Sequence, residues 1–298
     1  MRIAISGASG LIGTSLQDAL RKDGHQIQRI VRRPSAALDE VAWDPASRSI
    51  DLASLEGVDA IIHLAGAGVG DKRWSPEYRN TILTSRVEGT ETIAGAVAML
   101  KPKVFLSASA IGWYGETGNR AVSESDRGGD DFLANVCRDW EAAADLAGEV
   151  RTVKLRTGLI LDPKGGALGR MIPLFKAGIG GHLGSGRQWW SWITLRDQIG
   201  AIKHLLESEF SGPINLVSPN PATNIEVTAA LARALHRPAL LPVPAFALKI
   251  ALGGFSSEVL GSKKVLPEAL LADGYRFMDE HVATAIAHLL GTSRKPTR

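Results

Sequence analysis

Residues 1–13 read MRIAISGASGLIG, and this stretch decides the fold that we expect for the first half of the chain. The apolar run 2–6 predicts a buried strand, and the amphipathic pattern over 11–23 predicts a helix that follows almost at once. Between the two, glycines recur with the spacing G-x-x-G-x-x-G. In a strand-turn-helix unit, this spacing allows a tight turn, a close approach of the backbone to a pyrophosphate, and close packing of helix on strand. The stretch therefore predicts a dinucleotide-binding turn. Its expected contacts are Gly7, Ser9, Gly10, Leu11, Ile12 and Gly13.

The same alternation of strand and helix patterns continues along the first 160 residues. Short aliphatic runs predict strands near 2–6, 26–31, 59–64, 103–108 and 150–156. Longer amphipathic stretches predict helices near 11–23, 76–99 and 131–147. This order indicates an α/β fold of the Rossmann type, a doubly wound parallel sheet with helices on both faces.

Beyond residue 160 the sequence changes in character. Glycine-rich segments at 163–166 and 178–186 predict loops, and apolar runs at 199–207 and 213–217 could return to the sheet. The remainder from Pro219 is predicted to be mainly helical. We therefore expect a dinucleotide-binding domain over 1–160, its sheet completed by parts of 187–217, and a smaller, mainly helical substrate region over 161–298. Residues 293–298 are expected to form a frayed tail.

The composition excludes several classes of function. The formal net charge is +3, and the lysines and arginines are spread along the chain, which does not favour a nucleic-acid partner. The longest apolar stretch, 243–254, contains Pro244 and Lys249 and is too short to span a bilayer, so we expect no membrane contact. The single cysteine, Cys137, excludes an intramolecular disulfide and disfavours a structural zinc site. We expect a cytosolic protein without a metal.

The end of the second predicted strand indicates which dinucleotide is bound. Arg32 and Arg33 follow the run 26–31. A site for NAD carries a carboxylate at this place, which accepts from the ribose hydroxyls, whereas guanidinium groups suit a 2′-phosphate. The pair therefore predicts NADP(H) as the cofactor. The alternative is a pair of solvated arginines at a strand end.

Further motifs give the chain a family resemblance. They read HLAG at 63–66, SRVEGT at 85–90 and SASAIGWYG at 107–115. With the glycine turn, they resemble the extended short-chain dehydrogenase/reductase superfamily over about the first 160 residues. The stretch GSGRQWWSWI at 184–193 and the context of Lys263, Val265, Leu266 and Pro267 are similar to one atypical branch. Its members are named NAD(P)-dependent epimerase-family protein or nucleoside-diphosphate-sugar epimerase, and some carry a cell-division-inhibitor label.

The resemblance implies roles for individual residues. Leu64, Ala65 and Gly66 would line the adenosine side of the cofactor, and Arg86, which replaces the usual Asn, would face the cofactor from its helix. Ser109 falls where the superfamily's catalytic Ser or Thr binds the substrate oxygen. Segment 156–160 would pass the nicotinamide. The cofactor contacts implied in these strands are Ser107, Arg156, Gly158 and Leu159. A homodimer through the helices near 76–99 and 131–147 is also implied.

The proton-transfer pair departs from the superfamily. Its Tyr-x-x-x-Lys motif uses an ammonium to lower the pKa of the phenol and to hold the ribose. Here Cys137 and Glu141 keep the spacing and share one helix face, but a carboxylate raises the pKa of a neighbouring acid. Three hypotheses remain. Cys137 donates the proton while Glu141 faces the ribose, Tyr114 supplies the proton instead, or the chain binds NADP(H) without turnover. Cys137 could also be an inert buried thiol, and Tyr114 could pack beside Trp113.

The residues expected to bind the substrate also differ from those of the superfamily. In sugar-nucleotide enzymes of the extended group an arginine contacts the diphosphate, and Trp190 occupies that position here. Trp189, Trp190 and Trp192 could form an aromatic platform, although tryptophans so close together are about as often core packing. Arg187 could take over the anionic contact. We therefore expect an NADP(H)-dependent oxidoreductase or epimerase-like enzyme for a small carbonyl, hydroxyl or sugar-derived substrate. The alternative is a catalytically inactive NADP(H)-binding sensor.

Overall fold

An eight-stranded sheet forms around β1 (Arg2–Ser6), in which Ile3, Ala4 and Ile5 are fully buried. Its strands are, in spatial order, β12 (Gly212–Leu216), β8 (Thr152–Thr157), β6 (Val104–Ala110), β5 (Ala60–His63), β1, β2 (Gln26–Val31), β3 (Glu40–Asp44) and β4 (Ser49–Ile50). The strands from β8 to β3 pair in parallel, and β4 pairs antiparallel with β3. The Rossmann-type sheet expected from the sequence is confirmed.

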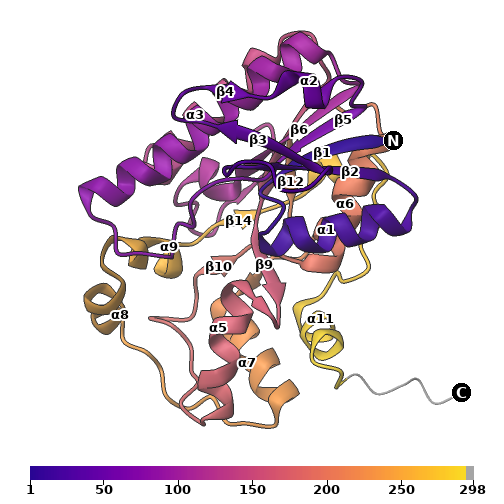
Figure 1. Cartoon of the computed structure of the whole chain (residues 1–298). Helices are drawn as coiled ribbons and strands as arrows, with labels where there is room; N and C mark the ends of the chain where they lie inside the picture. The colour runs from indigo at the N-terminus through magenta and orange to yellow at the C-terminus, as the bar shows by residue number, and fades with distance from the viewer. Residues whose placement is uncertain (293–298) are drawn as a thin grey trace, which may run out of the picture. The chain divides into compact units, whose positions relative to one another are not determined.

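Helices cover both faces of this sheet. In the computed structural model, which describes residues 1–292, α1 (Leu11–Lys22) and α3 (Pro76–Leu100) lie on opposite sides of the strands (Figure 1). Against the α3 face, Ile93 and Val97 pack on Ile61 and Phe105 of the central strands. Helix α4 (Phe132–Ala144) packs beside α3, and Asp131 caps its N-terminus by accepting from the amide of Ala134. The shorter elements here are α2 (Leu52–Leu55), η1 (Ile111–Tyr114) and η2 (Asp145–Ala147).

Two segments differ from the expectation. The sequence analysis did not predict β3, a short strand that carries a charged residue at each end. The proposal that 199–207 returns to the sheet is wrong, because this run is part of helix α6 (Leu195–Glu207). Its buried residues Ile199, Ile202 and Leu206 recur at helical spacing and not at the alternate spacing of a strand. The run 213–217 does contribute the strand β12.

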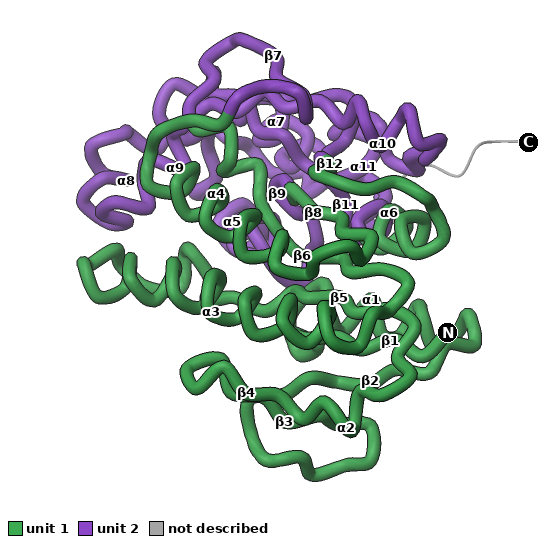
Figure 2. Tube along the Cα trace, turned by 90° about the horizontal axis from the view of Figure 1, so that it is seen from above, with its two compact units in different colours: residues 1–115, 128–157, 199–214 green, residues 116–127, 158–198, 215–298 purple. Residues whose placement is uncertain are grey.

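Contacts divide the chain into two compact units, which Figure 2 shows in different colours. Unit 1 comprises Met1–Gly115, Gly128–Thr157 and Ile199–Ile214. Unit 2 comprises Glu116–Arg127, Gly158–Gln198 and the chain from Asn215 onward. The expected division at residue 160 lies near the boundary at Thr157, but segments 116–127 and 199–214 each belong with residues distant in sequence.

Unit 2 is built around a core of α5 (Gly166–Lys176), α7 (Asn224–Leu235) and α11 (Val282–Leu289). Its other helices are α8 (Ala245–Leu252), η3 (Gly253–Phe255), α9 (Ser256–Leu260) and α10 (Glu268–Ala272). Its short strands are β7 (Ala121–Val122), β9 (Leu159–Asp162), β10 (Trp189–Trp190), β11 (Trp192–Thr194), β13 (Ala222–Thr223) and β14 (Lys264–Val265). No helix within residues 1–292 is long and apolar enough to cross a membrane. The expectation for 293–298 lies outside the described residues.

Candidate functional site

The glycine turn is held by backbone contacts that no larger residue would allow. Gly7 has φ +70°, and a Cβ on Gly7 would lie 2.7 Å from the carbonyl carbon of Leu64. A Cβ on Gly13 would lie 2.3 Å from the carbonyl oxygen of Gly7. The N-cap of α1, Gly10, provides no side-chain cap, and the first turn of α1 contains no acidic residue. The backbone N–H groups at this helix end are therefore suited to an anion.

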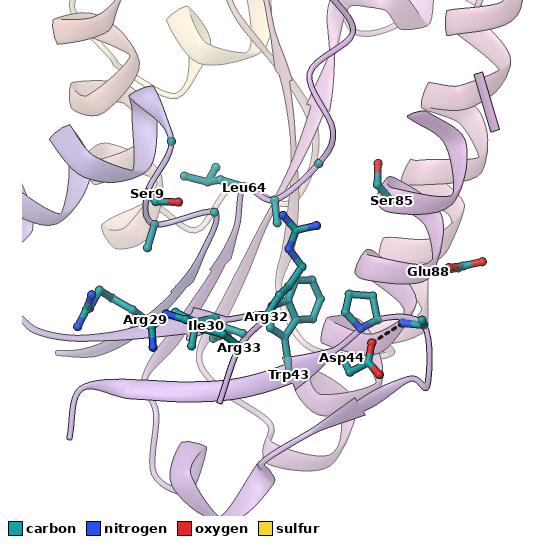
Figure 3. A pocket seen from close by; sticks show the side chains of 18 of the residues that line it. Ser9, Arg29, Ile30, Arg32, Arg33, Trp43, Asp44, Leu64, Ser85 and Glu88 are labelled. Atoms are coloured by element: carbon teal, nitrogen blue, oxygen red, sulfur yellow. Dashed lines mark hydrogen bonds between the residues drawn. The ribbon is translucent and has the colours of Figure 1, made fainter. Parts of the chain in front are cut away.

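A pocket of about 980 Å³ lies in front of this turn, within unit 1. Its volume suits a large ligand such as a dinucleotide. Figure 3 shows the side chains around it, which come from β2, the end of β3, the segment after β5 and α3. Of the cofactor residues expected from the sequence, the pocket is lined by Gly7, Ser9, Gly10, Arg32, Arg33, Leu64, Ala65 and Gly66.

One wall of this pocket was missed by the sequence analysis. Residues Trp43, Asp44, Pro45 and Ala46 line it at the end of β3, and Ser85 and Glu88 line it from α3. The alternation of buried Val41 and Trp43, followed by the turn-forming pair Asp44-Pro45, was the available signal. The signal for Ser85 and Glu88 was the segment SRVEGT at 85–90, which contains both residues and carries part of the family resemblance.

The two arginines at the end of β2 have different environments. Arg33 binds the buried carboxylate of Glu40 with two hydrogen bonds of 2.7 and 2.5 Å. The hydrogen bond from Arg33 is the main reason that the pKa of Glu40 is lowered. Arg32 makes no side-chain hydrogen bond or ion pair with any described residue, and Figure 3 shows it extending into the pocket. Of the two predicted phosphate ligands, Arg32 therefore has its guanidinium unengaged and Arg33 does not.

A buried histidine lies behind the turn. The Nδ1 atom of His63 is 2.6 Å from the hydroxyl of Ser6, and the same hydroxyl accepts from the amide of Leu64 at 3.2 Å. The indole of Trp43 meets the imidazole edge-on, with ring centroids 5.8 Å apart. Burial lowers the pKa of His63 to about 3. The imidazole is therefore neutral at ordinary pH. It lies between the hydroxyl of Ser6, the residue before the glycine turn, and the indole of Trp43, which lines the pocket.

Three of the four residues predicted to be catalytic, Ser109, Tyr114 and Glu141, form a buried cluster around an ion pair in unit 1. Glu141 accepts from Arg156 at both carboxylate oxygens, at 2.8 Å from Nε and 2.9 Å from Nη2. The hydroxyl of Ser109 donates to the same carboxylate at 2.7 Å. Arg156 also donates through Nη1 to the phenol oxygen of Tyr114 at 3.1 Å, and it lies 4.0 Å from the ring centroid of Trp113. The structure thus brings Ser109, Tyr114, Glu141 and Arg156 together.

This cluster changes the interpretation of the helix positions 137 and 141. Protein donors engage both oxygens of Glu141, which does not support a role for this carboxylate at a ribose. The thiol of Cys137 is buried and donates to the carbonyl oxygen of Ala110 at 3.6 Å. The spacing is that of the superfamily pair, but Glu141 is the partner of Arg156 and Ser109, and Cys137 faces the backbone at the end of β6.

Arg86 and Ser107 lie near these residues in unit 1. Arg86 donates through Nη1 to the carbonyl oxygens of Ala67 and Ile82, and its guanidinium lies 5.0 Å from the ring centroid of Trp140. Ser107 is buried opposite His63 in the ladder of β5 and β6, and its hydroxyl has no hydrogen-bond partner among the described residues. Their assignment to the cofactor stays a prediction.

The substrate residues expected in unit 2 receive a correction. Trp192 is fully buried in the unit 2 core and donates through its indole N–H to the carbonyl oxygen of Asn220, so it cannot present a ring face to a ligand. Trp190 is partly buried against the same core, while Arg187 is exposed. Gly158 and Leu159 also lie in unit 2. There Leu159 pairs with Trp192, and a Cβ on Gly158 would lie 2.6 Å from the carbonyl oxygen of Ser191.

No group of three or more His, Cys, Asp or Glu side chains within residues 1–292 is arranged to hold a metal ion. Three acidic or histidine side chains at the site, Glu40, Glu141 and His63, have hydrogen-bond partners within the protein.

Known proteins resemble this chain along nearly its whole length. An epimerase family protein of Mycobacterium leprae, ML0860, is 41% identical over 291 residues, which cover 96% of this chain and 94% of that protein. The crystal structure of the human epimerase family protein SDR39U1 (isoform 2) with NADPH matches with a TM-score of 0.91 and 32% identity, over 98% of this chain and 100% of that one. A nucleoside-diphosphate sugar epimerase structure from Corynebacterium glutamicum matches with a TM-score of 0.81 and 33% identity, over 98% of this chain and 58% of that one.

The sequence also matches two described families. Residues 243–289 match a domain of unknown function, DUF1731. Residues 3–217, which contain the glycine turn, the pocket and the Glu141–Arg156 ion pair, match the NAD dependent epimerase/dehydratase family. The family resemblance found in the sequence is thereby confirmed, and the chain belongs to the NAD dependent epimerase/dehydratase family.

Proposed function

We propose that this protein binds NADP(H) in the unit 1 pocket and acts as an oxidoreductase or epimerase-like enzyme on a small carbonyl, hydroxyl or sugar-derived substrate. The observation that carries the proposal is the pairing of the glycine turn with the unengaged guanidinium of Arg32 in one pocket. The human relative that was crystallised with NADPH adds support, because it matches this chain over its full length.

The residues present fit this cofactor. The N–H groups at the start of α1 suit the pyrophosphate, since no side chain caps them and glycines leave the approach open. Arg32 suits the 2′-phosphate, because a guanidinium pairs with phosphate oxygens through charge-assisted hydrogen bonds. Residues 43–46 and 64–66 offer two walls for the adenosine. Arg33 would take no direct part, because Glu40 holds it.

The Ser109–Glu141–Arg156–Tyr114 cluster supplies the candidate proton chemistry. Bound NADPH supplies a hydride to a carbonyl carbon and is itself oxidised, and the carbonyl oxygen then needs a proton. Ser109 has a single hydroxyl proton and gives it to Glu141, so Ser109 can accept a hydrogen bond but not donate one. Tyr114 receives a hydrogen bond from Arg156, which favours the phenolate that remains after proton release. Tyr114 is therefore the better candidate for the proton donor than Cys137, and water would restore its proton.

A second candidate function is cofactor binding without turnover. It is favoured by the burial of the cluster. Ser109 and Tyr114 are only 4% and 3% exposed, and both are hydrogen-bonded to other members of the cluster. The two candidates share the cofactor and differ in whether Tyr114 ever reaches a substrate.

Replacing Arg32 by Gln is expected to weaken NADPH binding about 10- to 100-fold and to leave NADH binding unchanged. A hydrogen-bonded charged pair contributes about 1.5–3 kcal/mol, and about 1.4 kcal/mol is a tenfold change in affinity. Fluorescence titration of NADPH and NADH measures both constants. Arg33→Gln is the matched control and should keep the preference for NADPH, because Arg33 is bound to Glu40. An unchanged preference in Arg32→Gln would refute the role of Arg32, and no NADPH binding by the native protein would refute the proposed function.

Tyr114→Phe separates the two candidate functions. If the protein turns over NADPH with any member of a panel of aldehydes, ketones and keto sugars, we expect this variant to lose at least 100-fold in kcat with NADPH affinity within a factor of about two, because the loss is confined to proton transfer. Absorbance at the NADPH band measures the rate. Cys137→Ala is the control and should retain activity. A Tyr114→Phe enzyme as active as the native one would exclude this donor, and binding without turnover across the panel would favour the second candidate.

A further inference from the structure

Arg86 is a part-buried cation without a carboxylate partner. Two other arginines near the site are neutralised by protein acids, Arg33 by Glu40 and Arg156 by Glu141, whereas Arg32 lies at the open pocket, unpaired among the described residues. None of the ion pairs within residues 1–292 includes Arg86, although this residue lies in the interior of unit 1 between α3 and α4. A charge removed from water without a counter-ion is costly, so its retention calls for a physical reason.

The guanidinium is held in place, but only part of its hydrogen-bonding capacity is used. Nη1 donates to the carbonyl oxygens of Ala67 and Ile82 at 2.9 and 3.0 Å, and the indole of Trp140 supports the group at 5.0 Å. A guanidinium has five N–H donors, and Nη1 accounts for two of them. Nε and Nη2 donate to no acceptor among the described residues. Together they form the forked edge that binds a carboxylate or phosphate through two parallel hydrogen bonds.

The acids that face Arg86 do not neutralise it. These are the thiol of Cys137 and the phenol of Tyr78. The pKa of Tyr78 is raised, mainly by burial, so its phenol is uncharged at neutral pH. The thiol of Cys137 donates to the carbonyl oxygen of Ala110 at 3.6 Å. Burial is also the main reason that the pKa of Arg86 is lowered.

Arg86 lies where two parts of the candidate site meet. Gly66, which lines the cofactor pocket, is so near that a Cβ on it would lie 3.5 Å from Cγ and Cζ of Arg86. Cys137, on the other side, contacts Ala110, the residue after Ser109. Gly66 follows β5, and Ala110, the residue that Cys137 contacts, ends β6. Both positions are therefore at the carboxyl ends of strands. In doubly wound sheets this edge is where ligands bind.

We propose that Arg86 binds an oxyanion of the bound ligand, a carboxylate or a phosphate, through its Nε and Nη2 edge. The oxyanion belongs either to the cofactor's pyrophosphate or to an acidic substrate placed beside Ser109. The inference rests on the proposed function only in assuming that the ligand enters at this edge of the sheet.

The test compares the native protein with Arg86→Gln, which removes the charge, and Arg86→Lys, which keeps the charge without the fork. Arg79→Gln is the matched control, because Arg79 lies on the same helix but is exposed and rests on the rings of Trp74 and Phe132. Fluorescence titration gives the Kd for NADPH and NADH. Calorimetry gives the Kd of inorganic phosphate and of oxalate, each for the free protein and for the NADPH-loaded protein.

If the pyrophosphate is the partner, Arg86→Gln weakens NADPH and NADH alike by at least tenfold, and Arg86→Lys recovers part of the loss. If an acidic substrate is the partner, NADPH affinity changes less than twofold, while phosphate or oxalate binding to the NADPH-loaded protein falls at least tenfold. Arg79→Gln changes neither the cofactor affinities nor the anion affinities.

If a folded Arg86→Gln protein keeps the native Kd values for both cofactors and both anions, the proposal is overturned. If the native protein does not bind NADPH, the proposed function is refuted. The role of Arg86 is then decided by comparing phosphate and oxalate binding to the free native and Arg86→Gln proteins. If Arg86→Gln does not fold, Arg86→Lys decides, because the loss of the fork alone is expected to weaken the affected ligand at least threefold.

Discussion

Arg156→Met is expected to destabilise the protein by about 3–5 kcal/mol, because it leaves the carboxylate of Glu141 buried without a counter-ion. Arg156 provides two of the three hydrogen bonds that reach this carboxylate, and the remaining one comes from the neutral hydroxyl of Ser109. Both members of the pair are almost fully inaccessible, with side chains 3% and 6% exposed. Urea denaturation measures the change in the free energy of unfolding.

Two controls show whether the loss of stability arises from the unpaired buried carboxylate of Glu141. Lys154→Met is on the same strand and breaks an ion pair with the exposed Asp145, so we expect a loss below about 1 kcal/mol. The double variant Glu141→Gln/Arg156→Met removes both charges and should recover a large part of the stability lost by Arg156→Met. If Arg156→Met is no less stable than Lys154→Met, the buried ion pair does not have the role that we assign to it.

Acid is expected to destabilise the protein through His63, beginning near pH 6.5. The pKa of this histidine is lowered by burial from 6.5 to about 3. Above pH 6.5 the imidazole is neutral in both the folded and the unfolded protein, so it contributes no pH dependence. As the pH falls below 6.5, the unfolded chain takes up a proton that the folded protein does not, and stability declines until about pH 3. At about 1.4 kcal/mol per pH unit, the loss from this group reaches about 3 kcal/mol at pH 4.

The variant His63→Asn isolates this contribution, because it cannot be protonated in this range and its side-chain amide can bond to Ser6. Between pH 6.5 and 4 the native protein should lose about 3 kcal/mol more of its free energy of unfolding than His63→Asn loses. His236→Asn is the control, since His236 is exposed at a left-handed position, φ +52°, that Asn also adopts. Its pH profile should match that of the native protein. Identical profiles for His63→Asn and the native protein would show that His63 takes up its proton without unfolding.

The parts of the fold that depend on local pattern were predictable from the sequence. The glycine turn and the strands β1, β2, β5, β6 and β8 follow from residues adjacent in the chain, since strand and helix periodicities are local properties. The short strand β3 was not predicted, because five residues with charged ends carry little pattern. The run 199–207 was misread because an apolar run without flanking turns fits a strand or a buried helix equally well.

Side-chain partners across elements could not be predicted in the same way. Arg32 and Arg33 are indistinguishable in the sequence, because the acid that pairs with Arg33 alone is Glu40, on the unpredicted strand β3. Glu141 and Arg156 were both predicted as site residues, but with separate roles. One lies on α4 and the other on β8, and only the packing of that helix on that strand reveals the ion pair. The buried Trp192 could not be told from an exposed platform for the same reason.

The exchange of segments between the two units has a consequence for how the chain is synthesised. Domains generally fold as units as they leave the ribosome, the N-terminal one first. Here β8 ends at Thr157, but its outer neighbour β12 begins only at Gly212, after most of the intervening chain has been used in unit 2. A nascent chain of 160 residues therefore presents β8 as an open strand edge, which is prone to pair with other chains. The sheet is completed only once residue 216 has emerged, so unit 1 cannot finish folding until the segment 158–198 of unit 2 has already been synthesised.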